Sequence, residues 1–127
     1  MSKILNGRNV EVAASFTVGA EAANAIAVTV QLSDRKNGGD MSERINVAWY
    51  LSADANGDTI AAAPSSGIAI GTDGLLIEWT ANVAGMVTSE ADGDIDVVLT
   101  EASTGTWYLA LVMPDGKLYV SGAITFA

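Results

Sequence analysis

Apolar and polar residues alternate with a period of two along most of the chain. The clearest examples are the runs at 10–18, 26–32, 45–51 and 95–99. Successive side chains of a β-strand point to opposite faces, so this pattern predicts half-buried strands of antiparallel sheets. The segment Ala20–Ala25 is rich in helix-forming residues, but it is too short for a stable helix and is expected to form a loop.

Turn residues separate these runs at short intervals. Pro114, Asp115 and Gly116 lie between two apolar runs, 106–113 and 117–126, and predict a β-hairpin. Asn-Gly and Asp-Gly pairs elsewhere divide the chain into about seven to nine short strands. We therefore expect an all-β fold, an antiparallel sandwich or barrel. It would be a single domain over residues 10–127, preceded by an N-terminal arm of residues 1–9.

The longest expected loop runs from Asp54 to Gly67 and contains Pro64, which disfavours a central strand. Aromatic residues occur as two adjacent pairs, so each pair sends one ring to each face of a sheet. We expect Trp49 and Trp107 in the core, and Tyr50 and Tyr108 half exposed. Trp79 shares the parity of Leu75 and Ile77, and its side of the sheet is ambiguous.

The charge of the chain is unevenly distributed. The 127 residues have a net charge of −9, yet no basic side chain lies between Arg44 and Lys117, a stretch with ten carboxylates. An acidic body of this kind repels nucleic acid and anionic lipid. No apolar run approaches the roughly 20 residues that span a membrane. We therefore expect neither nucleic acid nor membrane as a partner.

The composition also disfavours common catalytic chemistry. The chain contains no His and no Cys, which are the most frequent general base and the strongest side-chain nucleophile. Asp94 and Asp96 could form a carboxylate pair of the glycosidase type, but they lie in a solvated run beside a turn, where no raised pKa is expected. The sequence predicts a protein that is not an enzyme and that needs no cofactor.

Two acidic segments raise the question of calcium. Asp54, Asn56 and Asp58 alternate with other residues, as do Asp92, Asp94 and Asp96, and calcium sites use oxygen ligands at such positions. Neither segment continues with the glycine and the glutamate that an EF-hand loop requires. We expect turns on an acidic surface and no bound metal, and the sequence leaves calcium binding open.

Basic residues concentrate in the first third of the chain. The arm 1–9 combines apolar and basic side chains without a carboxylate, and such an arm can lie on an acidic neighbour or pair with a sheet edge. A frayed terminus is the equally weighted alternative. The expected partner-contact residues are Lys3, Ile4, Leu5, Arg8, Arg35, Lys36 and Arg44.

Parts of the chain resemble bacterial and phage immunoglobulin-like domains. The stretch from Ile26 to Leu51 is similar to their opening strand, turn and strand, and GTWYLALV resembles a late strand entered through a glycine. This resemblance implies an all-β fold, an immunoglobulin-like antiparallel β-sandwich. The opening KILNGRNVEVAASFTVG, the acidic SEADGDIDVVLTE and the ending GAITFA also resemble small virion proteins of tailed bacteriophages.

This resemblance implies a structural role in a virion, which would be made in the host bacterial cytoplasm. The implied function is that of a capsid decoration or cement protein. It would bind the major capsid protein or another virion protein on the outside of the head and would form a homo-oligomer, with a trimer as one option. The alternative is a receptor- or glycan-binding module of a tail or fibre, in which Tyr50, Tyr108 and the long loop would engage the ligand.

Overall fold

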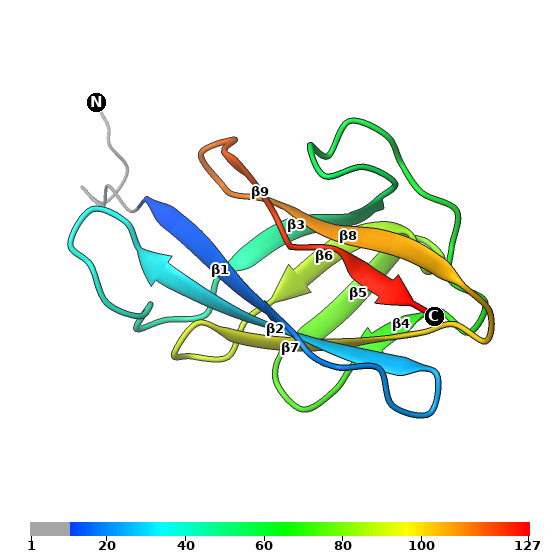
Figure 1. The fold of residues 1–127 in the computed structure, drawn as a ribbon. Coiled ribbons are helices and arrows are strands. Elements are labelled where there is room, and N and C mark those ends of the chain that lie inside the picture. Colours follow the sequence, from blue (N-terminus) through cyan, green and yellow to red (C-terminus); the bar gives the residue numbers. More distant parts are fainter. Residues whose placement is uncertain (1–10) are drawn as a thin grey trace.

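The fold is an all-β sandwich of two antiparallel sheets (Figure 1). The computed structural model describes residues 11–127, and this part of the chain contains ten strands and no helix. No helix that could cross a membrane is therefore found in these residues. The strands are β1 (Val12–Val18), β2 (Ala25–Asp34), β3 (Asn46–Ser52), β4 (Ile68–Ile70), β5 (Leu75–Thr80), β6 (Ala84–Thr88), β7 (Asp94–Thr100), β8 (Gly105–Val112), β9 (Leu118–Val120) and β10 (Ile124–Phe126).

The strand order matches an immunoglobulin arrangement with one additional hairpin. One sheet has the order β1-β2-β7-β4, and the other has the order β10-β8-β3-β6-β5, with β9 also paired to β8. Constant-type immunoglobulin domains place strands A, B, E and D against G, F and C. In this chain, the positions of A, B, E and D are taken by β1, β2, β7 and β4. The positions of G, F and C are taken by β10, β8 and β3. The hairpin β5–β6 extends the second sheet beyond β3.

Alternation along the strands builds the core between the sheets. In β7 the side chains of Ile95, Val97 and Leu99 are buried while the intervening residues are partly exposed. The facing sheet contributes Trp49, which is 1% exposed and donates its indole N–H to the carbonyl oxygen of Ile77 at 3.2 Å. The predicted core positions of Trp49 and Trp107 are both confirmed.

The predicted hairpin after β8 is confirmed, and its returning strand is interrupted. Both β9 and β10 pair with β8, one after the other. At the break, Ser121 exchanges backbone and side-chain hydrogen bonds with Leu109: its N–H donates to the Leu109 carbonyl at 2.9 Å, and its Oγ accepts the Leu109 N–H at 2.9 Å. The strand count of ten exceeds the predicted seven to nine because β4, β9 and β10 have only three residues each, too few to show an alternation.

The loops expected at 20–25 and 54–67 are also present. The first leads into β2 through Ala23 and Asn24, which both have positive φ values. The second contains no strand, apart from an isolated bridge between Ser52 and Ile60. Its first part folds back onto the six-stranded sheet, which matters for the surface described below.

Candidate interaction surface

Two of the predicted basic contact residues, Arg35 and Arg44, form side-chain contacts within the chain. Lys3, Ile4, Leu5 and Arg8 lie outside the described residues. Arg35 forms ion pairs with Glu11 at 2.7 Å and Asp115 at 3.2 Å. Lys36 lies in the exposed turn after β2, where its backbone N–H donates to the Asp34 carboxylate at 3.0 Å. Partner contact by these side chains stays a prediction, and the structure gives two of them a local role.

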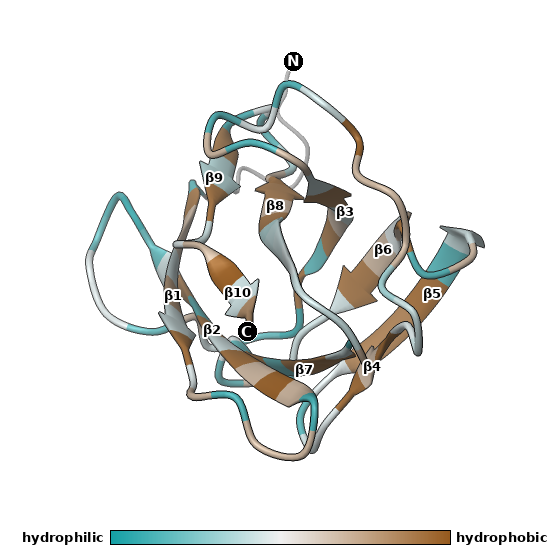
Figure 2. Ribbon diagram, turned by 45° about the vertical axis from the view of Figure 1, so that its right-hand side comes forward, coloured by the Kyte–Doolittle hydropathy of each residue, from teal (hydrophilic) through white to brown (hydrophobic). Residues whose placement is uncertain are grey.

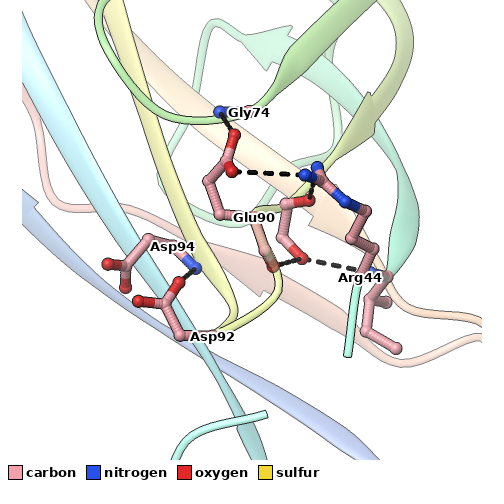
Figure 3. Close-up of polar contacts among 7 residues, drawn as sticks. Arg44, Gly74, Glu90, Asp92 and Asp94 are labelled. Atoms are coloured by element: carbon pink, nitrogen blue, oxygen red, sulfur yellow. Dashed lines mark hydrogen bonds and ion pairs between the residues drawn. The ribbon is translucent and has the colours of Figure 1, made fainter. Parts of the chain in front are cut away.

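Arg44 belongs to a separate polar cluster that joins three segments of the chain (Figure 3). Its guanidinium lies 3.4 Å from the Glu90 carboxylate and donates to the Ser89 carbonyl at 3.2 Å. The other Glu90 oxygen accepts the backbone N–H of Gly74 at 2.9 Å. Glu90 therefore holds the start of β3 and the turn before β5 together, and Arg44 orients it.

The two acidic segments form turns that use their carboxylates internally. Asp54 accepts the backbone N–H groups of Asn56 and Asp58, each at 3.0 Å, and these bonds, led by that of Asp58, lower the pKa of Asp54. Asp92 accepts the N–H of Asp94 at 3.3 Å. Partial burial, and then the charge of Asp92, raise the pKa of Asp94. No group of three or more potential ligands in residues 11–127 is arranged to hold a metal ion.

Glu101 is the most strongly held carboxylate of the described chain. It is 5% exposed and accepts hydrogen bonds from the Ser103 hydroxyl at 2.6 Å, the Ser65 N–H at 2.7 Å and the Ser103 N–H at 3.0 Å. These bonds, led by that of the Ser103 hydroxyl, lower its pKa to about 2. A carboxylate so stabilised in its ionised form is a poor general acid or base at neutral pH, and its role is to fasten the loop before β4 to the end of β7.

The outer face of the four-stranded sheet is largely polar and carries aspartates, apart from one row of small apolar side chains formed by Ala27, Val98 and Ala69. The strand registers align Ser15, Gln31 and Asp94 in one row, and Thr17, Thr29 and Asp96 in the next. Asp96 also accepts the backbone N–H and hydroxyl of Thr72, which anchors the turn between β4 and β5. This face has the composition expected of a surface that stays in water.

The outer face of the six-stranded sheet carries an apolar row, with the polar pair Asn46 and Thr88 on the neighbouring row. The registers align one row across five strands: Leu118, Val112, Ala48, Met86 and Ile77. Over β3 and β9, part of this face is covered by the loop after β3. There the Tyr50 hydroxyl donates to the Gly57 carbonyl at 2.6 Å, and Gly57 approaches Leu118 and Val120 so closely that a Cβ on it would lie 3.0 and 3.3 Å from their methyl groups.

The other end of the same face is open. On β5 the side chains of Leu75, Ile77 and Trp79 are 60%, 49% and 66% exposed, and we call these three residues the β5 apolar surface. Figure 2 shows β5 at the margin of its sheet, with much of its length in the hydrophobic colour. Large apolar side chains that gather on one exposed face commonly mark a contact surface.

The sequence left open which side of the sheet Trp79 faces, and it did not predict Leu75 or Ile77 as contact residues. One signal was present, because Leu75, Leu76 and Ile77 are three consecutive apolar residues and a half-buried strand needs only one apolar face. Such a segment is covered on both sides or leaves an apolar face exposed. The predicted partial exposure of Tyr50 and Tyr108 agrees with the structure, but the Tyr50 hydroxyl is already bonded to Gly57.

No pocket is found among residues 11–127, so the candidate site of this chain is a surface. A scan against models of known protein families gives no match, and a search of curated proteins finds no relative. The comparisons therefore add no support to the resemblance to virion proteins.

Proposed function

We propose that this chain is a non-enzymatic structural protein that attaches to a larger protein assembly. The observation that carries the proposal is the difference between its two outer faces. One face presents threonine, glutamine and aspartate side chains, and the other presents the exposed side chains of Leu75, Ile77 and Trp79. A protein with one face in water and the other face bound to an assembly needs this distribution of polar and apolar side chains.

The apolar side chains can supply binding free energy, and the negative charge can keep the protein soluble. Aromatic and aliphatic side chains at the centre of an interface supply most of the binding free energy, and tryptophan is enriched among such residues. The net charge of −9 keeps free copies apart before they bind. An acidic protein with one uncharged apolar face is thus suited to attach in many copies without aggregating.

The setting that we propose is the outer surface of a tailed-bacteriophage capsid, where the chain acts as a decoration protein. This part of the proposal comes from the sequence resemblance. On such a shell many weak contacts act together, because copies bound side by side raise one another's effective concentration.

A co-sedimentation experiment tests this function. Shells assembled from the major capsid protein encoded nearest to this chain would be mixed with the purified protein and pelleted. We expect the native chain to sediment with the shells, and the variant Ile77→Ser/Trp79→Ser to remain in the supernatant. The matched control is the variant Thr17→Ala/Thr29→Ala. It also changes two exposed positions, but these lie on the outer face of the four-stranded sheet.

Two results would contradict the proposal. The first is a genomic neighbourhood without capsid genes together with no sedimentation of the native chain. The second is loss of sedimentation with the Thr17/Thr29 variant and not with the Ile77/Trp79 variant. A glycan array tests the receptor-binding alternative, in which Tyr50, Tyr108 and the long loop would engage the ligand. The same array read with the Ile77/Trp79 variant shows whether the exposed Trp79 contributes to any binding.

A further inference from the structure

We propose that β5 pairs with β5 of a second copy of this chain, antiparallel and centred on Ile77, to join two six-stranded sheets into one. The proposal starts from the position of β5. It is the last strand of its sheet, bonded to β6 on one side and to no strand on the other among the described residues. An edge strand with free N–H and C=O groups is a template for pairing with another chain.

The orientation of the Ile77 carbonyl shows which groups of β5 face the open edge. A Cβ added to Gly85 of β6 would lie 1.8 Å from this oxygen, so the carbonyl points toward β6. The same oxygen accepts the indole N–H of Trp49, which lies on β3. Backbone groups alternate in direction along an extended strand, and the register of β5 with β6 is regular from Leu75 to Glu78, before it shifts between Glu78 and Thr80. The N–H and C=O groups of Leu76 and Glu78 therefore point to the open edge.

Only one two-fold register uses both of these residues well. When Ile77 lies opposite Ile77 of the second copy, Leu76 of each copy lies opposite Glu78 of the other and exchanges both backbone hydrogen bonds with it. A shift that centres the pair on Glu78 would set two carboxylates directly opposite each other, which is unfavourable. A shift that centres it on Leu76 shortens the paired segment.

The side chains of the β5 apolar surface complement one another in this register. Leu75 of each copy faces Trp79 of the other, a residue within the register shift between Glu78 and Thr80, and the two Ile77 side chains meet between them on the outer face. Directly opposed residues of a non-hydrogen-bonded pair have closely spaced side chains, and pairs of aromatic and aliphatic residues stabilise a sheet. The segment Leu75–Trp79 is thus self-complementary about its centre.

The size of this contact predicts a reversible dimer. A standard stable interface buries about 800 Å² on each partner. One tryptophan contributes about 150–250 Å² when buried, and two partly exposed aliphatic side chains add less, so edge pairing covers only a part of that area. The net charge of −9 on each copy opposes association through solvent, and added salt should strengthen the dimer.

The dimer would also enlarge the surface of the proposed function. Edge pairing leaves the outer faces of both sheets open and joins them, so two β5 apolar surfaces form one continuous platform. This last consequence rests on the proposed function, whereas the pairing itself does not. Dimerisation in solution and sedimentation with shells can therefore fail independently.

Cysteine crosslinking tests the register directly, because the chain contains no cysteine. In the proposed dimer the Cα atoms of the two Ile77 residues lie about 4.5 Å apart, within disulfide range. We expect Ile77→Cys to form a disulfide-linked dimer under mild oxidation. The matched control is Leu118→Cys, a 42% exposed position at the opposite end of the same sheet, which should crosslink at least about ten times more slowly.

Charge substitution gives the second arm. Ile77→Lys places two like charges directly opposite each other and should weaken association about tenfold or more in sedimentation equilibrium. Ile77→Glu should do the same, and mixing the two variants should restore association as a heterodimer. Circular dichroism checks that each variant is folded.

A third measurement needs no variant. In hydrogen–deuterium exchange of the native chain, the amides of Leu76 and Glu78 should become protected as protein concentration rises. The proposal is overturned if the native chain stays monomeric at every accessible concentration. It is equally overturned if the chain dimerises while crosslinking at the two cysteine positions is equal, or while the protection appears elsewhere.

Discussion

The two sheets of this sandwich bury the same kind of core and present opposite kinds of outer surface. On the four-stranded sheet, Thr17, Thr29 and Asp96 align on the outer face. On the six-stranded sheet, the corresponding face carries an apolar row that ends at Ile77 on an open edge. The inner faces are dictated by folding alone, so the contrast between the outer faces carries the information about contacts.

The contrast also has a structural origin. The four-stranded sheet is complete within the immunoglobulin plan, whereas the additional hairpin β5–β6 widens the other sheet beyond the core that its partner can cover. Leu76 still packs against the core, but Leu75 and Ile77 project from the other side of the strand. The hairpin thus adds contact surface more than it adds core.

The largest expected effect is on the free energy of unfolding, when the packing of β5 against β6 is disrupted. Gly85→Ala would place a Cβ 1.8 Å from the Ile77 carbonyl oxygen and displace the strand from the Trp49 indole. We expect the free energy of unfolding to fall by about 3 kcal/mol in chemical denaturation.

Gly122→Ala is the control for this substitution, since a Cβ there meets no atom within 4 Å. It should change stability by less than about 0.5 kcal/mol. Equal stabilities of the two variants would contradict the described packing of β5 on β6.

The next largest effect concerns the junction between the sheets at Glu101. Its pKa is lowered from 4.5 to about 2, so its ionised form stabilises the fold above pH 4.5 and this contribution is lost as pH falls toward 2. We expect Glu101→Gln to lower the melting temperature at neutral pH, and the difference from the native chain to shrink below pH 4.5.

Ser103→Ala sharpens this test, because it removes the hydroxyl that lowers the Glu101 pKa most. The acid-induced loss of stability should still begin near pH 4.5, but it should be smaller and be complete at a higher pH than in the native chain. An unchanged pH profile in both variants would show that Glu101 does not fasten the loop in solution.

A smaller effect on stability separates the two outer faces. Ile77→Lys and Thr29→Lys each alter an exposed position, and we expect each to change the free energy of unfolding by less than about 0.5 kcal/mol. Only Ile77→Lys should lower the fluorescence of a bound hydrophobic dye. Equal dye binding by both variants would remove the distinction between the faces.

The smallest expected effect lies in the acidic face. Partial burial and neighbouring carboxylates, Asp92 foremost, raise the pKa of Asp94, so its charge opposes folding at neutral pH. Asp94→Asn should raise the melting temperature slightly at low salt, and the gain should vanish in acid and shrink at high salt, where the repulsion by Asp92 is screened. A lower melting temperature would show that the Asp94 carboxylate makes a stabilising contact.

Local pattern predicted much of the fold and little of the surface. Strong alternation identified β2, β3 and β7, and the Pro114–Gly116 turn identified the hairpin on β8, because these signals lie within a few residues. The position of β5 depends on β6 and on the absence of a covering element, which no local pattern contains. The Arg35–Asp115 ion pair likewise joins residues 80 positions apart, so the availability of Arg35 to a partner was not readable from its neighbours.

Acrylamide quenching of tryptophan fluorescence tests the central claim most directly. Of the three tryptophans, Trp49 and Trp107 are buried and Trp79 is 66% exposed, so quenching of the free protein reports mainly on Trp79. If the β5 apolar surface is the contact surface, quenching should fall sharply when the protein is bound to shells. Unchanged quenching of shell-bound protein would contradict the account and would direct the search for the contact to another face.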